Sequence, residues 1–309
     1  MNPSQTNLSP HAPGIQCATP GFPPAPETPM KLLAPLAAAV LLAVASANAQ
    51  AAHVLVVLSD ADHLDLRDGQ VYPTGFYLNE LMQPVKALRD AGHEITFATP
   101  EGRAPTVDRT SVDKAYFGND VASLQSHADL LAQLRLTSAT QSPVLSLARV
   151  EQIGYGEFDA VYIPGGHAPM QDLLASPALG RLLTDFHQQG KPTALVCHGP
   201  IALLSTLPGN AAFVQRMERD NRAPAPADWI YAGYQVTVIS NDEEEQAKAA
   251  LNGGRMKFYP QTALQHAGVA YRSNAQPWQS NVVVDRELIT GQNPASAEGV
   301  AKVLLERLD

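Results

Sequence analysis

The distribution of apolar residues along the chain predicts several buried strands. Residues 53–58, 160–163 and 194–196 are almost entirely apolar and do not alternate with polar residues. Such continuous runs are typical of strands in parallel sheets, which are covered on both faces. The pattern therefore favours a mostly parallel sheet between layers of helices.

A stretch with helical periodicity follows the first of these runs. Leu81, Val85 and Leu88 keep the i, i+4, i+7 spacing of one helix face. Pro84 is tolerated in a first helical turn, which places Glu80 at or just before the start of this helix. Residues 93–98 read as the next strand, so the segment predicts a right-handed β-α-β unit.

Strands and helices continue to alternate, which predicts one α/β domain over residues 50–309. The further elements expected are helices at 121–136, 177–189 and 296–308, a strand at 234–239 and a hairpin at 282–290. In the first of these helices we expect His127 to lie at the surface and not to act as a ligand.

The N-terminal residues do not fit this domain. Residues 1–29 are rich in proline and lack an apolar period, which predicts a disordered segment or an extension from a misassigned start codon. Residues 30–49 combine a charged start, an apolar run and small residues ending at Ala49, which predicts a secretory signal peptide. An uncleaved membrane anchor is the alternative. If the signal peptide is used, we expect a periplasmic or secreted protein without stable membrane association. If it is not used, we expect a cytoplasmic protein.

Composition narrows the possible partners and cofactors. The net charge is -9 and no basic cluster occurs, which argues against nucleic acid and anionic membranes as partners. No metal-ligand spacing and no Gly-rich phosphate loop is present, so we expect neither a metal nor another cofactor. Cleavage would remove Cys17 and leave Cys197 without a disulfide partner, either inert or reactive.

Cys197 follows a predicted strand and precedes the apolar residues 201–204, which predicts a strand-to-helix turn. The free N–H groups of a helix start favour a thiolate, so Cys197 is a candidate nucleophile with a lowered pKa. The alternative is a small buried core residue. The backbone N–H groups of Gly166 and His198 could converge on the sulfur as an oxyanion hole. A polar stretch with two prolines, residues 216–228, is expected to form a loop over the edge of the sheet where Cys197 lies.

Three motifs in a fixed order carry a family resemblance. They are Ile-Pro-Gly-Gly-His at 163–167, Val-Cys-His-Gly-Pro at 196–200 and Leu-Ile-Thr-Gly-Gln-Asn-Pro-Ala-Ser at 288–296. Together they resemble the ThiJ/PfpI superfamily, and within it the heat-shock, glyoxalase III-like branch. The resemblance implies a flavodoxin-like, doubly wound sheet with helices on both faces, similar to class I glutamine amidotransferases. It also implies a homodimer.

The resemblance also implies roles for individual residues. Glu80 matches a glutamate that hydrogen-bonds the nucleophilic sulfur, whereas the residues alone favour an ordinary carboxylate at a helix start. Asp242 or Glu243 matches a third acidic group near the histidine, and we expect Glu244 and Glu245 to be solvated. His198 is either a proton carrier or a turn residue that contributes only its N–H. For Trp278 a place in the pocket wall and a packing role both remain open.

These residues suggest a cofactor-free, cysteine-dependent lyase of the glyoxalase III or D-lactate dehydratase type. In this hypothesis Cys197 attacks a small carbonyl substrate such as methylglyoxal, and His198 or Glu80 moves a proton between adjacent carbons. Hydrolysis of the thioester then releases a 2-hydroxy acid. The alternatives are a stress-protective chaperone and a redox sensor, in which Cys197 would oxidise to a sulfinate held by protonated Glu80.

Overall fold

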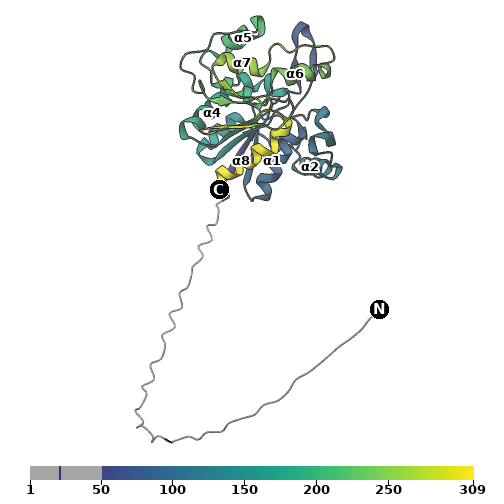
Figure 1. The fold of residues 1–309 in the computed structure, drawn as a ribbon, viewed down its shortest axis with the longest axis vertical. Helices are drawn as coiled ribbons and strands as arrows, with labels where there is room; N and C mark the ends of the chain where they lie inside the picture. Colours follow the sequence, from purple (N-terminus) through teal and green to yellow (C-terminus); the bar gives the residue numbers. More distant parts are fainter. Residues whose placement is uncertain (1–20, 22–50) are drawn as a thin grey trace, which may run out of the picture. The chain divides into compact units, whose positions relative to one another are not determined.

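The computed structural model describes Gly21 and residues 51–309 of the 309-residue chain (Figure 1). The predicted extension at 1–29 and the predicted signal peptide at 30–49 therefore lie outside the described residues, apart from Gly21.

A seven-stranded sheet forms the centre of the described part of the chain, in the order β10-β11-β7-β6-β1-β4-β5. Its strands are β1 (His53–Val57), β4 (Glu94–Thr99), β5 (Leu145–Ser146), β6 (Ala160–Ile163), β7 (Thr193–Val196), β10 (Val282–Asp285) and β11 (Leu288–Gly291). All neighbouring pairs are parallel except the β10–β11 hairpin. The continuous apolar runs form β1, β6 and β7 and are buried, so the predicted α/β fold is confirmed.

Helices cover both faces of this sheet (Figure 1). They are α1 (Leu78–Asp90), α2 (Val121–Leu134), α3 (Leu147–Ile153), α4 (Pro177–Gln189), α5 (Asn210–Asp220), α6 (Asn241–Ala247), α7 (Pro260–Ala267) and α8 (Ala297–Leu308). Helix α1 packs against α2 and α8, whereas α4 packs against α3 and the 3₁₀ helix Gly199–Thr206. Among residues 51–309 no helix combines the length and the apolar character that a membrane crossing needs.

Helix α1 begins at Leu78 and carries Glu80 in its first turn, so the prediction that Glu80 lies at or before the start is wrong. Pro84 lies inside the helix and has no N–H for the Glu80 carbonyl four residues earlier. The hydroxyl of Tyr162, on β6, donates a hydrogen bond to that carbonyl instead. This side-chain donor explains why a proline is tolerated beyond the first turn.

Two predictions in the C-terminal half are wrong. Residues 216–220 belong to α5, in which Phe213 and Met217 are buried. The helix ends at Asp220, because the next residue, Asn221, has a left-handed backbone with a φ of 51°. The predicted strand at 234–239 is reduced to β8 (Gln235–Val236), which pairs with β9 (Ala270–Tyr271). Beyond β8 the backbone turns to other partners, and the N–H of Ile239 donates to the carbonyl of Cys197 at 3.1 Å.

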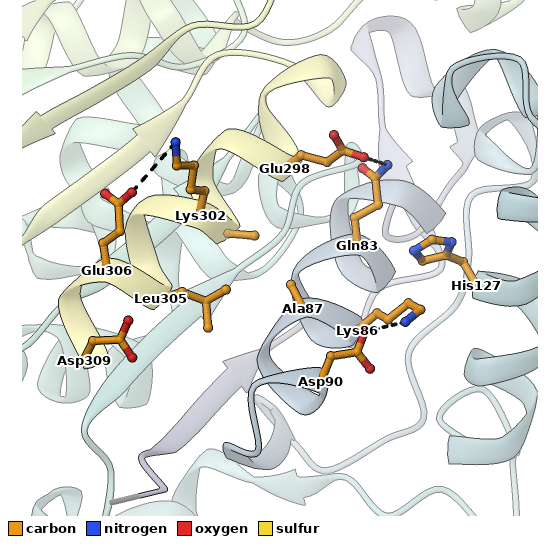
Figure 2. A pocket seen from close by; sticks show the side chains of 11 residues that line it. Gln83, Lys86, Ala87, Asp90, His127, Glu298, Lys302, Leu305, Glu306 and Asp309 are labelled. Atoms are coloured by element: carbon orange, nitrogen blue, oxygen red, sulfur yellow. Dashed lines mark hydrogen bonds and ion pairs between the residues drawn. The ribbon is translucent and has the colours of Figure 1, made fainter. Parts of the chain in front are cut away.

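His127 on α2 is also not the surface residue expected from the sequence. Its side chain is buried because the ring packs beside Phe117 at 5.1 Å between centroids, and its Nδ1 lies 2.7 Å from the carbonyl of Ser123. His127 lines a groove between α1, α2 and α8, which has a volume of about 420 Å³. Figure 2 shows its ring at the side of this groove.

Candidate active site

Cys197 lies at a sharp turn between β7 and the 3₁₀ helix Gly199–Thr206. Its φ is 60°, a left-handed conformation that is costly for a residue with a side chain. Backbone contacts on both sides hold the turn, since the Cys197 N–H donates to Gly291 and its carbonyl accepts from Ile239. Strain of this kind is typical of a nucleophile elbow, which presents the reactive atom above the sheet.

Two glycines allow the chain to pass close to this turn. A Cβ on Gly199 would lie 2.5 Å from the carbonyl oxygen of Ile163. A Cβ on Gly165 would lie 2.7 Å from both the Cys197 Cβ and the carboxylate of Glu80. Only glycine fits at these positions without displacing the groups around the sulfur.

The His198 side chain connects Cys197 to a buried carboxylate. The sulfur lies 3.3 Å from Nδ1 of His198, and Nε2 of His198 lies 2.8 Å from Oε1 of Glu244. The positive φ of Cys197 allows these two neighbouring side chains to meet. Of the two roles left open for His198, the geometry therefore favours direct contact with the sulfur.

Glu244 is buried, with an exposed fraction of 3 %, so the prediction that it is solvated is wrong. Burial alone would raise the pKa of Glu244, yet the neighbouring His198 and His167 hold that pKa below its usual value. Glu245, in contrast, is exposed as expected.

Neither Asp242 nor Glu243 is the third acid, which corrects the assignment made from the resemblance. Asp242 is exposed. Glu243 forms the capping box of α6 with Ser240 and also accepts hydrogen bonds from the Asn293 side chain at 2.7 Å and the Trp278 N–H at 2.7 Å. Because these contacts occupy its carboxylate, Glu243 anchors α6 while Glu244 faces His198.

Glu80 lies close to Cys197 and is fully buried. Its Oε2 accepts a hydrogen bond from the Gly165 N–H at 2.9 Å, while its Oε1 has no hydrogen-bond partner among the described residues. Burial raises the pKa of Glu80 to about 7, although Cys197, His198 and the Gly165 N–H oppose the shift. The interpretation as an idle helix-start carboxylate is therefore not supported by the geometry.

The lowered pKa expected for Cys197 is not found. Burial raises the pKa of the Cys197 thiol above its usual range, and the charges of Glu80 and Glu244 add to this effect. The N–H of Gly166, the residue expected in the oxyanion hole, acts in the opposite direction by hydrogen-bonding the sulfur. The carboxylate of Glu80 therefore disfavours the Cys197 thiolate, while the hydrogen bond with Cys197 opposes the rise in the pKa of Glu80.

The sulfur is accessible from a pocket of about 840 Å³, although Cys197 itself is only 2 % exposed. The floor includes Cys197, His198, Glu244 and His167. Much of the wall is apolar or aromatic and includes Tyr77, Tyr116, Phe117, Ile239 and Trp278. Trp278 therefore lines the pocket.

One feature expected near the pocket lies elsewhere. Of the described residues that line it, none comes from the stretch 216–228, so the prediction of a covering loop there is wrong. Gln83 and Glu298 border this pocket as well as the groove of Figure 2, where they hydrogen-bond each other at 2.9 Å.

Sequence reasoning did not foresee the position of His167, the last residue of the Gly-Gly-His motif. Its ring lies 4.4 Å from the His198 ring, between centroids, and its Nε2 is 3.9 Å from Oε2 of Glu244. His167, His198 and Glu244 are a possible set of metal ligands. Linear spacing could not reveal this set because its members follow β6, β7 and the start of α6.

The fold and the hydrogen-bonded triad of Cys197, His198 and Glu244 define a class of α/β proteins with a cysteine at a nucleophile elbow. Residues 72–250 match the family described as ThiJ/PfpI family-like. The chain therefore belongs to this family.

Individual relatives agree with this assignment. The chain is 26% identical to the probable glutathione-independent glyoxalase hsp3103 of Schizosaccharomyces pombe, covering 84% of this chain and 99% of the relative. It is 25% identical to the protein/nucleic acid deglycase HchA of Pseudomonas aeruginosa, covering 82% and 80%. Its fold is similar to the crystal structure of glyoxalase III from Candida albicans, with a TM-score of 0.62, 19% identity and coverage of 84% and 98%.

Proposed function

We propose that this protein converts methylglyoxal or a related 2-oxoaldehyde into a 2-hydroxy acid without glutathione or another cofactor. The observation that carries the proposal is one sulfur atom that lies 3.3 Å from Nδ1 of His198 and lines a pocket, with the buried carboxylate of Glu80 close to Cys197. The names of the relatives, glyoxalase and deglycase, support a reaction of small carbonyl compounds.

The first step is addition of the sulfur to the aldehyde carbon. His198 takes the thiol proton through Nδ1, and Glu244 stabilises the resulting imidazolium through Nε2. The aldehyde oxygen gains negative charge and is stabilised by the N–H groups of Gly166 and His198, which form the oxyanion hole. The product is a hemithioacetal on Cys197.

The second step moves a proton between the two oxidised carbons. Glu80 has a pKa of about 7, which suits a group that both removes and returns a proton near neutral pH. It takes the proton from the carbon attached to sulfur and delivers it, or an equivalent proton, to the adjacent carbon. The former aldehyde carbon is thereby oxidised to a thioester and the ketone is reduced to an alcohol, so no external electron carrier is needed.

The last step is hydrolysis. Water attacks the thioester, the carbon–sulfur bond breaks and the sulfur regains a proton. The net reaction adds one water to the oxoaldehyde and releases a 2-hydroxy acid. The site supplies the same groups for this step, since the oxyanion again forms beside Gly166 and His198.

A panel of 2-oxoaldehydes and simple aldehydes, assayed without glutathione, tests this proposal. We expect the wild type to consume 2-oxoaldehydes and Cys197→Ala to lose at least ~10³-fold in rate, as expected for removal of a nucleophile. Circular dichroism and the thermal midpoint must show that the variant is folded. Equal rates in the two proteins would remove the proposal.

The size of the pocket favours a second candidate, the repair of carbonyl adducts on amines or thiols. A volume of about 840 Å³ lies in the range of roughly 300–1,000 Å³ that holds drug-sized ligands, well above the need of a three-carbon aldehyde. Release of free N-acetylarginine from its methylglyoxal adduct, measured with excess free aldehyde scavenged, distinguishes direct repair from simple removal of methylglyoxal.

A further inference from the structure

Three side chains able to bind a metal ion converge beside the nucleophile. His167 follows β6, His198 follows the elbow and Glu244 lies in the first turn of α6. One ligand atom from each lies within 4.8 Å of the others, and all three residues are buried. They also line the Cys197 pocket, so an ion can reach them from solvent.

His167 has no hydrogen-bonding role in the described structure that explains its burial. Its side chain is 6 % exposed, and its Nδ1 has no hydrogen-bond partner among the described residues. Its Nε2 is 3.9 Å from Oε2 of Glu244, too far for a hydrogen bond. Buried polar atoms are nearly always paired, so hydrogen bonds among the described residues do not account for the buried His167 ring, and this ring lies in a cluster of possible ligands.

The donor types of the cluster agree with a cation as that partner. The three residues offer two imidazole nitrogens and one carboxylate oxygen. These are donor atoms that divalent metal ions bind.

We propose that His167, His198 and Glu244 form a binding site for a zinc-like divalent cation, and that the bound ion inhibits the enzyme. Two histidines and one glutamate are a donor set used by zinc, with a fourth position open to the pocket. Imidazole ligands favour such an ion over magnesium or calcium, which prefer oxygen. The inhibitory part of this proposal rests on the proposed function, whereas the binding part does not.

Inhibition follows because the metal site shares His198 and Glu244 with the catalytic triad of Cys197, His198 and Glu244. A cation on Nε2 of His198 replaces the contact with Glu244 that stabilises the imidazolium, and it weakens Nδ1 as a base for the Cys197 proton. The ion also occupies the floor of the pocket, where the carbonyl group of the substrate must lie.

Metal binding can be measured separately from turnover. We would purify the protein with a chelator, remove the chelator and titrate zinc chloride by calorimetry and by the thermal midpoint. Zinc should bind at one equivalent and raise the midpoint. Cys197→Ala should still bind one equivalent because it keeps all three ligands, and this result would stand even if no glyoxalase activity were found.

Two histidine variants test the location. His167→Gln should weaken zinc binding by more than about 100-fold, since loss of a direct ligand exceeds the 10- to 100-fold effect of changing a ligand's supporting contact. His63→Gln is the matched control, because the His63 side chain is 41 % exposed beside Asp62 and could bind zinc adventitiously. It should bind zinc as the wild type does.

The glyoxalase assay tests inhibition in the same proteins. Stoichiometric zinc should suppress the wild type and His63→Gln, and excess chelator should restore the rate. Unchanged zinc binding in His167→Gln, loss of binding in His63→Gln or loss of binding in Cys197→Ala would each overturn the proposed site. Full activity of the zinc-loaded wild type would overturn its inhibitory role.

Discussion

Replacing Glu244 with glutamine removes one charge from the triad of Cys197, His198 and Glu244 and leaves the size of the side chain almost unchanged. The carboxylate lies 2.8 Å from Nε2 of His198 and is 3 % exposed, so little solvent can substitute for it. A hydrogen bond to a charged group contributes about 1.5–3 kcal/mol, and about 1.4 kcal/mol corresponds to a tenfold change in rate. We therefore expect Glu244→Gln to lower kcat/KM for methylglyoxal by about 10- to 150-fold.

The neighbouring Glu245 offers a matched control. It is exposed and contacts Lys248 and Tyr259 on the surface. Glu245→Gln should retain kcat/KM within about twofold, because exposed ion pairs contribute little. Initial rates are measured without glutathione on both variants after their thermal midpoints are compared. A well-folded Glu244→Gln with wild-type kcat/KM, or equal losses in both variants, would refute the catalytic role of Glu244.

Three further predictions concern stability. Burial raises the pKa of Glu80 from 4.5 to about 7, so the folded protein keeps a proton that the unfolded chain has lost, and stability falls as pH rises across this window. In urea unfolding, the unfolding free energy of Glu80→Gln minus that of the wild type should therefore rise by up to about 3 kcal/mol from about pH 5 to pH 8. A difference that does not change with pH would contradict the raised pKa of Glu80. Tyr162→Phe leaves the Glu80 carbonyl without its donor and should cost about 1–3 kcal/mol of unfolding free energy. Tyr155→Phe, which removes a buried hydroxyl that has no partner among the described residues, should cost nothing, and similar losses in the two variants would argue against the donor role. Gly199→Ala should lower the unfolding free energy by about 1–3 kcal/mol, as overpacking does, because its Cβ would lie 2.5 Å from the Ile163 carbonyl oxygen. Gly156→Ala is the control and should not lower it, since a Cβ there has nothing within 4 Å. Equal stabilities of the two variants would show that the turn can widen freely.

The sheet and the elbow were predictable because their signals are local. Continuous apolar runs predicted β1, β6 and β7, and the residues around Cys197 predicted the turn that follows β7. The boundaries of α1 were less accessible, because the donor that compensates for Pro84 comes from Tyr162, far along the chain. A rule about proline in helices cannot include a partner that only the tertiary structure provides.

The choice of the third acid depended on the orientation of α6. Successive residues of a helix point about 100° apart, so a run of acids does not show which one faces inward. Here Asn293 and the backbone of Trp278 bind Glu243, and this anchoring turns Glu244 toward His198. The motif that contains Asn293 was recognised in the sequence, but its contact with α6 was not.

The pKa of Cys197 shows a competition between a local and a tertiary effect. The position after a strand and before a helical turn favours a thiolate. Burial and two carboxylates, from Glu80 and Glu244, outweigh that preference. The sequence contained these acids, but their distance from the sulfur depended on the packing of α1 and α6 against the elbow.

Covalent attachment of substrate to the sulfur tests the mechanism most directly. The protein would be mixed rapidly with methylglyoxal, quenched in acid during turnover and digested for peptide mass spectrometry. The mechanism predicts that the Cys197 peptide gains the mass of one methylglyoxal, as expected for both the hemithioacetal and the isomeric thioester, and loses it when the substrate is consumed. Continued turnover with an unmodified Cys197 would contradict it.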